Sequence, residues 1–201
     1  KIFQMQNQIK RLTKKLQLTN IINTGSNVLQ GNINNSNNVS LLAYEQTTHK
    51  FLHDRDYIRS IKDCNYCVKT FIEKVHFNAA HPENMNVYIS SIKANHIMVY
   101  KNNRWNIVDR YVQLENMYLD NEFQIESWYG EYKDQYPEII QSFNRYLHNK
   151  EENELMNRVK KEILFMLYNK RHQVTENYKN MKIRQEYQKL LDAENAINEV
   201  L

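Results

Sequence analysis

The stretch His76-Phe-Asn-Ala-Ala-His81-Pro-Glu-Asn-Met-Asn-Val-Tyr-Ile89 places two histidines, one carboxylate, three asparagines and a proline in the eleven residues from His76 to Asn86. Side chains of these types can organise a turn, bind a metal ion or move a proton. An alternating pattern typical of a strand follows directly from Asn86. We therefore interpret the flanking sequence as helices that lead into this turn and a hairpin that leaves it.

Before this turn, the residue pattern predicts three helices. Apolar and histidine positions between residues 41 and 53 share one face at helical spacing. Asp54 or Asp56 can cap a second helix, whose apolar residues fall between 57 and 61. From residue 64 to residue 76, cysteines and larger apolar residues recur every three or four positions. The apolar face of this third helix is wide, as expected for a helix buried in a core.

After the turn, the sequence predicts a small antiparallel meander of two or three strands. Residues 86–90 and 97–100 are expected to be strands, and residues 105–108 continue as the returning strand. The polar residues Lys101-Asn-Asn-Arg104 form the turn between the last two. Because so small a sheet is stable only when a helix covers it, we expect the preceding helix to pack on it.

Helices return after the hairpin. Residues 112–119 and 123–129 are expected to form two helices, and Pro137 can open a third. Residues 151–201 have mixed charge and contain neither Gly nor Pro. The sequence therefore predicts a long helical segment here, with a break between Thr175 and Lys182.

The chain begins with the pattern of a coiled-coil end, which we assign to residues 1–20. Its roughly two and a half heptads are too short to be stable alone, so they would form either the end of a longer coiled coil or a helix docked on the domain. We expect the longer coiled coil, which would join copies into a homodimer or homotrimer. Residues 21–38 follow as an asparagine-rich linker. The heptad positions expected to carry oligomerisation are Ile2, Met5, Ile9, Leu12 and Leu16.

The composition favours a fold dominated by helices. Three glycines and two prolines in 201 residues are too few for an all-β fold with many tight turns, and 41% hydrophobic residues are enough for a core. We therefore expect an α+β domain at residues 39–150 that carries the small antiparallel meander. Coiled-coil-like helices in residues 1–20 and 151–201 would flank this domain.

The block Val75-His-Phe-Asn78 is followed by Pro82-Glu-Asn-Met-Asn-Val-Tyr-Ile89, and Trp105 comes after the hairpin turn. This pattern resembles a domain of uncharacterised proteins from large nucleocytoplasmic DNA viruses, such as mimivirus-like viruses. The resemblance covers roughly residues 39–130. In those proteins the domain typically follows a coiled coil, and a Cys2His2-type zinc finger often lies further upstream. The positions that carry the resemblance are His76, Asn78, Pro82, Glu83, Asn84, Asn86, Tyr88 and Trp105.

The resemblance implies a viral protein located in the host cytoplasm, the viral factory or the virion. It brings no established activity with it. Two cysteines do not make a disulfide framework, which favours a reduced, intracellular protein. No apolar run is long enough to span a membrane, so we expect no membrane partner.

The central turn holds the residue types of a metal-dependent His-Asn-His nuclease, in which one His activates water. The catalytic candidates under this hypothesis are His76, Asn78, His81 and Glu83. In such nucleases the hairpin precedes the helix, whereas here the hairpin comes afterwards. In the alternative interpretation, the asparagines cap the helix end and hold the turn by bonding to backbone groups, with His76 as a hydrogen-bonded anchor.

Two residue pairs have the spacing of zinc ligands. His49-x3-His53 and Cys64-x2-Cys67 together would make a reversed Cys2His2 site, with zinc as the cofactor. The alternative interpretation is a pair of thiols in the core and two histidines on an amphipathic helix, because the cysteines fall within a helical apolar pattern. The protein would then have no cofactor.

Basic residues provide a third hypothesis, association with DNA or RNA through phosphate contacts. The net charge of +4 permits such a partner without requiring it. The alternative interpretation is ordinary solubility charge on solvated helix faces. The candidate nucleic-acid-binding residues are Lys10, Arg11, Lys14, Lys15, Lys101 and Arg104.

Assembly is the function that requires the fewest specialised side chains. Heptad patterns near both ends can bring copies together without an active site. We therefore expect a homo-oligomeric viral assembly, scaffolding or accessory protein without chemistry of its own. Nucleic-acid binding is the first alternative, and a metal-dependent nuclease is the second.

Overall fold

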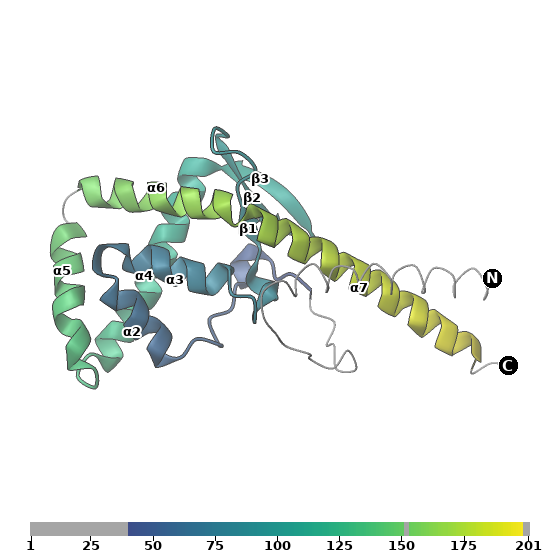
Figure 1. Ribbon diagram of the computed structural model, residues 1–201, viewed down its shortest axis with the longest axis horizontal. Coiled ribbons are helices and arrows are strands. Elements are labelled where there is room, and N and C mark those ends of the chain that lie inside the picture. The colour runs from purple at the N-terminus through teal and green to yellow at the C-terminus, as the bar shows by residue number, and fades with distance from the viewer. Residues whose placement is uncertain (1–39, 151–152, 199–201) are drawn as a thin grey trace. The chain divides into compact units, whose positions relative to one another are not determined.

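The computed structural model describes residues 40–150 and 153–198 (Figure 1). The chain contains a compact unit, Leu41–Val174, and the described residues 175–198 belong to a second unit. The compact unit is helix-dominated and carries one three-stranded antiparallel sheet. This confirms the predicted α+β fold class with a small meander.

Helix α2, Asp54–Lys62, begins with a reciprocal cap. The N-cap residue is His53, and of the two predicted capping residues, Asp54 and Asp56, it is Asp56 whose Oδ2 accepts from the backbone N–H of His53 at 3.0 Å. Two acidic residues in the first turn and two basic residues in the last turn also suit the helix dipole. The local sequence therefore accounts for both ends of this helix.

Helix α3, Cys67–His76, is the central helix of the compact unit. It contacts α2 on one side and α4, Arg110–Tyr132, and α6, Asn153–Asn169, on others. The continuous helix predicted from residue 64 is divided, because Cys64 adopts a left-handed φ of 51° and a short 3-10 turn precedes α3. Its fully buried side chains are Cys67, Val68, Phe71, Ile72 and Val75.

The segment between Leu41 and His53 is not the helix that its pattern predicted. It holds only a 3-10 turn at Tyr44–Gln46 and is otherwise irregular. Its backbone groups bond to the central turn instead, beginning with the N–H of Leu42, which donates to the carbonyl of Glu83 at 2.9 Å. Long-range hydrogen bonds therefore override the local helical periodicity here.

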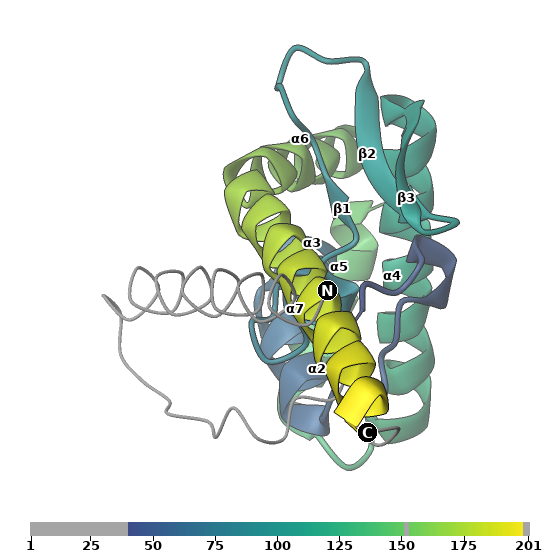
Figure 2. The ribbon, with the colours of Figure 1, turned by 90° about the vertical axis from the view of Figure 1, so that its right-hand side faces the viewer.

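The sheet contains β1, Val87–Tyr88, β2, His96–Lys101, and β3, Arg104–Asp109, in that order and antiparallel throughout (Figure 2). The three strands agree with the predicted meander. Asn102 and Asn103 connect β2 to β3 with φ values of 53° and 58°. Two consecutive positive φ values match the twist of a two-residue hairpin, and asparagine tolerates them better than most residues.

Helix α4 begins at a side-chain cap. The Asp109 carboxylate accepts from the backbone N–H groups of Tyr111 and Val112 at 2.9 and 3.0 Å. The helix then runs for 23 residues, where two shorter helices were predicted. The prediction failed because the polar residues at the expected break are buried within the fold: Nδ2 of Asn121 donates to the Met117 carbonyl, and Glu122 bonds to groups on the next helix.

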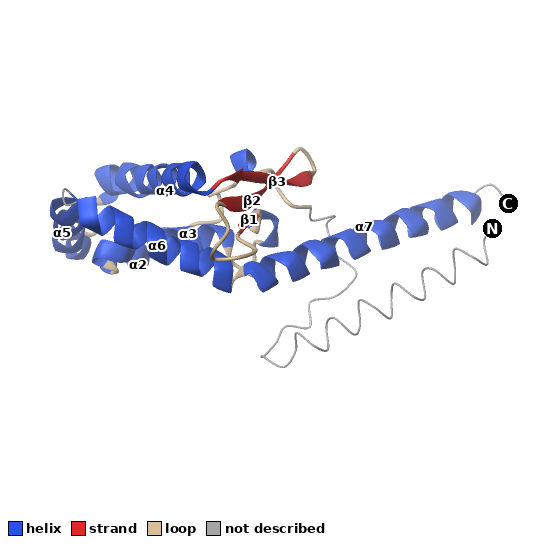
Figure 3. Ribbon diagram, turned by 90° about the horizontal axis from the view of Figure 1, so that it is seen from above, coloured by secondary structure: helices blue, strands red, loops and turns tan. Residues whose placement is uncertain are grey.

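A 3-10 turn, Pro137–Ile139, leads into α5, Ile140–Lys150, as the proline predicted. Helix α6 belongs to the compact unit, which therefore extends beyond residue 150, where the sequence placed its end. Figure 3 shows α4 and β3 along one side of this unit and α2 and α6 along the other. Helix α7, Arg171–Asn198, begins after Lys170, so the break predicted at residues 175–182 is wrong.

Candidate functional site

Three polar side chains of the central turn are buried together in the compact unit. His76 at the end of α3 is 2% exposed, and Asn84 and Asn86 are completely buried. Nδ1 of His76 lies 3.0 Å from Oδ1 of Asn86 and 3.2 Å from the carbonyl oxygen of Asn84. Both partners are acceptors, so Nδ1 carries the proton of the imidazole.

The two asparagines hold the irregular segment that precedes α2. Asn84 accepts from the N–H of Thr48 at 3.2 Å and donates to the carbonyls of Thr48 and Val75 at 2.8 and 3.2 Å. The Asn84 side chain thereby supplies hydrogen-bond partners for backbone groups of the irregular segment and of α3 that have no backbone partner. Because one side chain joins this segment to α3, removing it would leave several buried backbone groups unpaired.

Asn86 binds a neighbouring part of the same segment. Its Nδ2 donates to the carbonyl of Leu42 at 3.3 Å and to Oγ1 of Thr47 at 2.9 Å. Its own carbonyl accepts from the N–H of Tyr100 on β2 at 2.8 Å. This residue therefore links the segment, the turn and the sheet.

Burial of the His76 ring lowers its pKa to about 4, although the hydrogen bonds to Asn84 and Asn86 act in the opposite direction. The imidazole is therefore neutral at physiological pH. Its ring stacks on the phenol of Tyr44, with centroids 5.6 Å apart. The geometry agrees with the interpretation of His76 as an internal anchor.

The remaining catalytic candidates lie further out and are not gathered around His76. Oδ1 of Asn78 accepts from the N–H of Ala80 within the turn. Nδ1 of His81 lies 3.1 Å from Oε1 of Glu83, and its ring stacks on Phe51 at 3.8 Å. These contacts each serve the local turn, and the nuclease hypothesis stays a prediction without support from this geometry.

The proposed zinc ligands do not converge. The ring of His49 stacks on Phe71, and burial lowers its pKa. Both cysteines are free thiols, and burial raises the pKa of Cys67. Across the part of the chain that the structure describes, no three or more His, Cys, Asp or Glu side chains lie together in a group that could hold a metal ion. The backbone of His53 forms the N-cap of α2, and the zinc site stays a prediction.

Two of the nucleic-acid candidates flank the hairpin turn. Nζ of Lys101 lies 2.5 Å from Oε1 of Glu45, so its charge is already paired within the protein. Arg104 is exposed at the first position of β3. The other four candidates, Lys10, Arg11, Lys14 and Lys15, lie outside the described residues, as do the oligomerisation positions Ile2, Met5, Ile9, Leu12 and Leu16.

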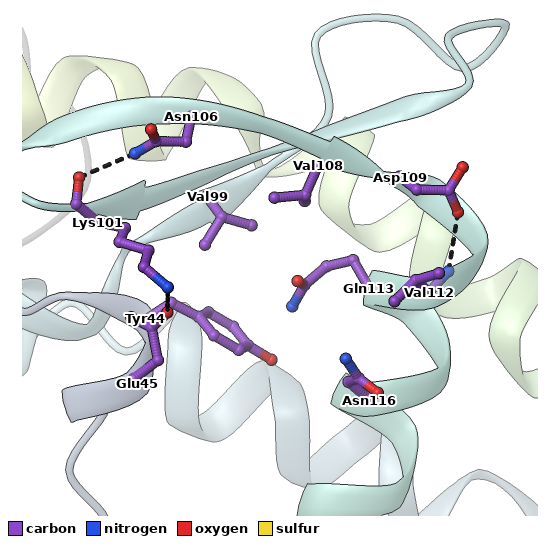
Figure 4. Close-up of a pocket in the computed structure, with 10 residues that line it drawn as sticks. All are labelled: Tyr44, Glu45, Val99, Lys101, Asn106, Val108, Asp109, Val112, Gln113 and Asn116. Atoms are coloured by element: carbon purple, nitrogen blue, oxygen red, sulfur yellow. Dashed lines mark hydrogen bonds and ion pairs between the residues drawn. The ribbon is translucent and has the colours of Figure 1, made fainter.

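A pocket that the sequence did not predict lies between the β2–β3 hairpin and α4 (Figure 4). Its volume is about 310 Å³. Cross-strand partners point to the same face of a sheet, so the pairing of Val99 with Asn106 directs both toward this space. The lining residues are Tyr44, Glu45, Val99, Lys101, Asn106, Val108, Asp109, Val112, Gln113 and Asn116.

The buried turn positions one wall of this pocket, because His76 supports the ring of Tyr44 from behind. Burial raises the pKa of the Tyr44 hydroxyl, the charge of Asp120 raises it further, and the amide of Gln113 acts in the opposite direction. Nε2 of Gln113 is nevertheless buried without a hydrogen-bond partner. Figure 4 shows the Gln113 side chain projecting from α4 into the space between Tyr44 and Val108.

A second surface that the sequence did not predict is the outward face of α4. All five of the large hydrophobic side chains that are clearly exposed among the described residues fall within residues 107–123. Val112, Leu119 and Phe123 are 60%, 44% and 64% exposed and lie on one face of α4 at spacings of seven and four. We name the stripe Val112, Asn116, Leu119, Phe123, Ser127 and Gly130 the α4 outer face; every member is exposed.

Comparisons of the chain with protein-family models, with curated proteins and with solved structures found no match. The resemblance of the central turn to a viral domain therefore stays a prediction. Among the helices that the structure describes, none has the length and apolar character needed to cross a membrane.

Proposed function

We propose that the chain is a homo-oligomeric assembly or scaffolding protein without chemistry of its own. The observation that carries this proposal is the α4 outer face, where Val112, Leu119 and Phe123 expose apolar surface together. Contiguous exposed apolar surface of this kind is typical of protein interaction sites. The resemblance of the central turn to a domain of large DNA viruses supports a viral setting for this assembly.

The α4 outer face suits a second copy of the same helix. Packed antiparallel, with Leu119 of one copy against Phe123 of the other, two such helices would also place Val112 against Gly130 at each end. Such an interface is isologous, so each apolar contact occurs twice. Aromatic and aliphatic side chains at the centre of an interface contribute most of its binding energy.

Gly130 provides a separate reason for a close helix contact. It lies within α4, where glycine costs about 1 kcal/mol relative to alanine. A Cβ atom added there would meet no atom within 4 Å, so packing inside the chain does not require glycine. A second helix that packs closely against α4 would require glycine at this position, because a missing side chain lets two backbones come close together.

The charges on one flank of the α4 outer face are compatible with this pairing. No member of the α4 outer face is charged. Glu115 and Glu126, which flank it, already pair with Lys160 and Lys150. In the antiparallel arrangement Glu115 of one copy lies across from Glu126 of the other, where the two lysines supply compensating charge.

Sedimentation velocity of the full chain and of a Phe123→Asp variant tests this function. We expect the parent to sediment as an oligomer and the variant to lose the association that α4 supplies, because each dimer would bury two unpaired carboxylates. Asn144→Asp, which adds the same charge to an exposed position of α5, serves as the control and should sediment like the parent. A parent that is monomeric at every concentration would contradict the proposal.

A further inference from the structure

The pocket between the β2–β3 hairpin and α4 has an apolar wall. Val99 and Val108 face it from the sheet, and Val112 faces it from the helix (Figure 4). The volume of about 310 Å³ lies at the lower end of the range for small-molecule sites. The space therefore suits a small molecule with an apolar ring.

A buried side chain of the pocket lining carries a hydrogen-bond donor that is not fully satisfied. Gln113 is 8% exposed, and its Nε2 makes no hydrogen bond of normal geometry, although the amide lies close enough to the Tyr44 hydroxyl to lower its pKa. A buried polar group without a partner costs about 1–3 kcal/mol, and a ligand oxygen would recover that cost. The Gln113 amide carries an acceptor next to this donor, so it can pair with a ligand group of the same kind.

The charges of the lining residues disfavour an anionic ligand. Lys101 is the only cation of the lining, and it pairs with Glu45. The Asp109 carboxylate caps α4 through two backbone N–H groups. No free cation is left among the lining residues for an anion, and the hydroxyl and amide groups of Tyr44 and Gln113 favour a neutral partner.

We propose that this pocket binds a small uncharged molecule in which an amide-type group, a carbonyl next to an N–H, is joined to an apolar ring. The ring packs on Val99 and Val108, on the sheet side of the pocket. The carbonyl accepts from Nε2 of Gln113, and the ligand N–H donates to the amide oxygen of Gln113 or the hydroxyl oxygen of Tyr44.

Benzamide, benzoate and toluene, titrated into the ¹⁵N-labelled full chain, separate the parts of this proposal. The three probes share a ring, but only benzamide carries a neutral amide. We expect benzamide to shift the side-chain amide signals of Gln113 and the backbone signals of Val108 and Val112. Benzoate and toluene should bind at least about tenfold more weakly, equivalent to about 1.4 kcal/mol. Equal binding of all three probes, or no shift at Gln113 with benzamide, would overturn the proposal.

A Gln113→Leu variant distinguishes a ligand-binding role from a structural one. We expect this variant to lose benzamide binding while its melting temperature stays the same or rises, because leucine buries no unpaired amide. Gln124→Leu makes the same change on the same helix outside the pocket and should leave benzamide binding unchanged. Benzamide binding that survives Gln113→Leu would contradict the proposal.

Discussion

The imidazole of His76 lies parallel to the phenol ring of Tyr44, with centroids 5.6 Å apart and planes inclined by 5°. This contact joins the two main features of the compact unit. On one side of it, His76 belongs to the buried hydrogen-bond cluster that holds the irregular segment before α2. On the other side, Tyr44 forms a wall of the pocket against α4. The polar residues of the central turn therefore help to hold the Tyr44 ring in the wall of the pocket.

Replacing Asn84 by alanine should lower the free energy of unfolding by about 3 kcal/mol, because it would remove the partners of the buried Val75 carbonyl and of two partly buried backbone groups of Thr48. Urea denaturation measures this change. Asn78→Ala is the matched control, since Asn78 makes one hydrogen bond at the protein surface and should cost less than about 1 kcal/mol. Equal losses in the two variants would refute the role assigned to Asn84.

The pKa of His76 predicts an acid-dependent loss of stability. The unfolded chain binds a proton at this position near pH 6.5, whereas the folded chain does so only at about pH 4. The stability contribution is therefore fully present above pH 6.5 and is lost as pH falls toward 4, by about 3 kcal/mol in all.

Denaturation of the parent and of His76→Phe at pH 7, 6, 5 and 4 isolates this effect. We expect the difference in unfolding free energy between the two proteins to become smaller as pH falls, because phenylalanine does not titrate. A difference that is constant over this range would show that His76 protonates equally in both states. The His76 ring signals in NMR spectra provide a second reading: they should keep the neutral, Nδ1-protonated form at pH 6.

A buried network between α4 and α5 gives another prediction. The Tyr146 hydroxyl donates to Oε1 of Glu122, and it lies 2.7 Å from the hydroxyl of Tyr118. Burial raises the pKa of both tyrosines, so they stay protonated. Tyr146→Phe should lower the unfolding free energy by about 2 kcal/mol, since it removes a hydrogen bond to a buried charged group.

Tyr118→Phe serves as the comparison for this network, because the short contact of the Tyr118 hydroxyl is with the Tyr146 hydroxyl, whereas Tyr146 itself donates to Glu122. It should cost about 1 kcal/mol, the contribution of a neutral hydrogen bond. Thermal denaturation at pH 7 measures both variants. A larger loss for Tyr118→Phe than for Tyr146→Phe would mean that the network is organised differently.

At the hairpin turn, one substitution should raise the free energy of unfolding and another should lower it. Asn103→Gly should raise the unfolding free energy by up to about 1 kcal/mol, because glycine adopts the positive φ of this position without strain. Asn103→Val should lower it by about 1–2 kcal/mol, since a β-branched residue is strained there. Both variants melting at the parent temperature would be evidence against this turn.

The sequence predicted the elements whose cause is local. Asn102 and Asn103 indicated the hairpin, Pro137 indicated the start of a helix, and the apolar face of α3 indicated its burial. The prediction failed where residues distant in the sequence determine the local conformation. The segment around Thr48 resembles a helix in isolation, yet Asn84 holds it in an irregular conformation.

The pocket and the α4 outer face could not be predicted for a related reason. Gln113 is buried on α4 because the sheet and Tyr44 cover that position, and no local pattern shows this. The exposed stripe could have been noticed. Val112, Leu119 and Phe123 share a helical face, but dividing α4 into two helices at residue 120 separated Phe123 from the others.

The measurement that tests the proposed function most directly is the molar mass in solution of a full chain in which the coiled-coil seam is disabled. Ile9→Asp and Leu16→Asp remove the predicted N-terminal association and leave α4 unchanged. Light scattering should then still report two copies, and adding Phe123→Asp should yield a monomer. A seam-disabled chain that is already monomeric at all concentrations would contradict self-association through the α4 outer face.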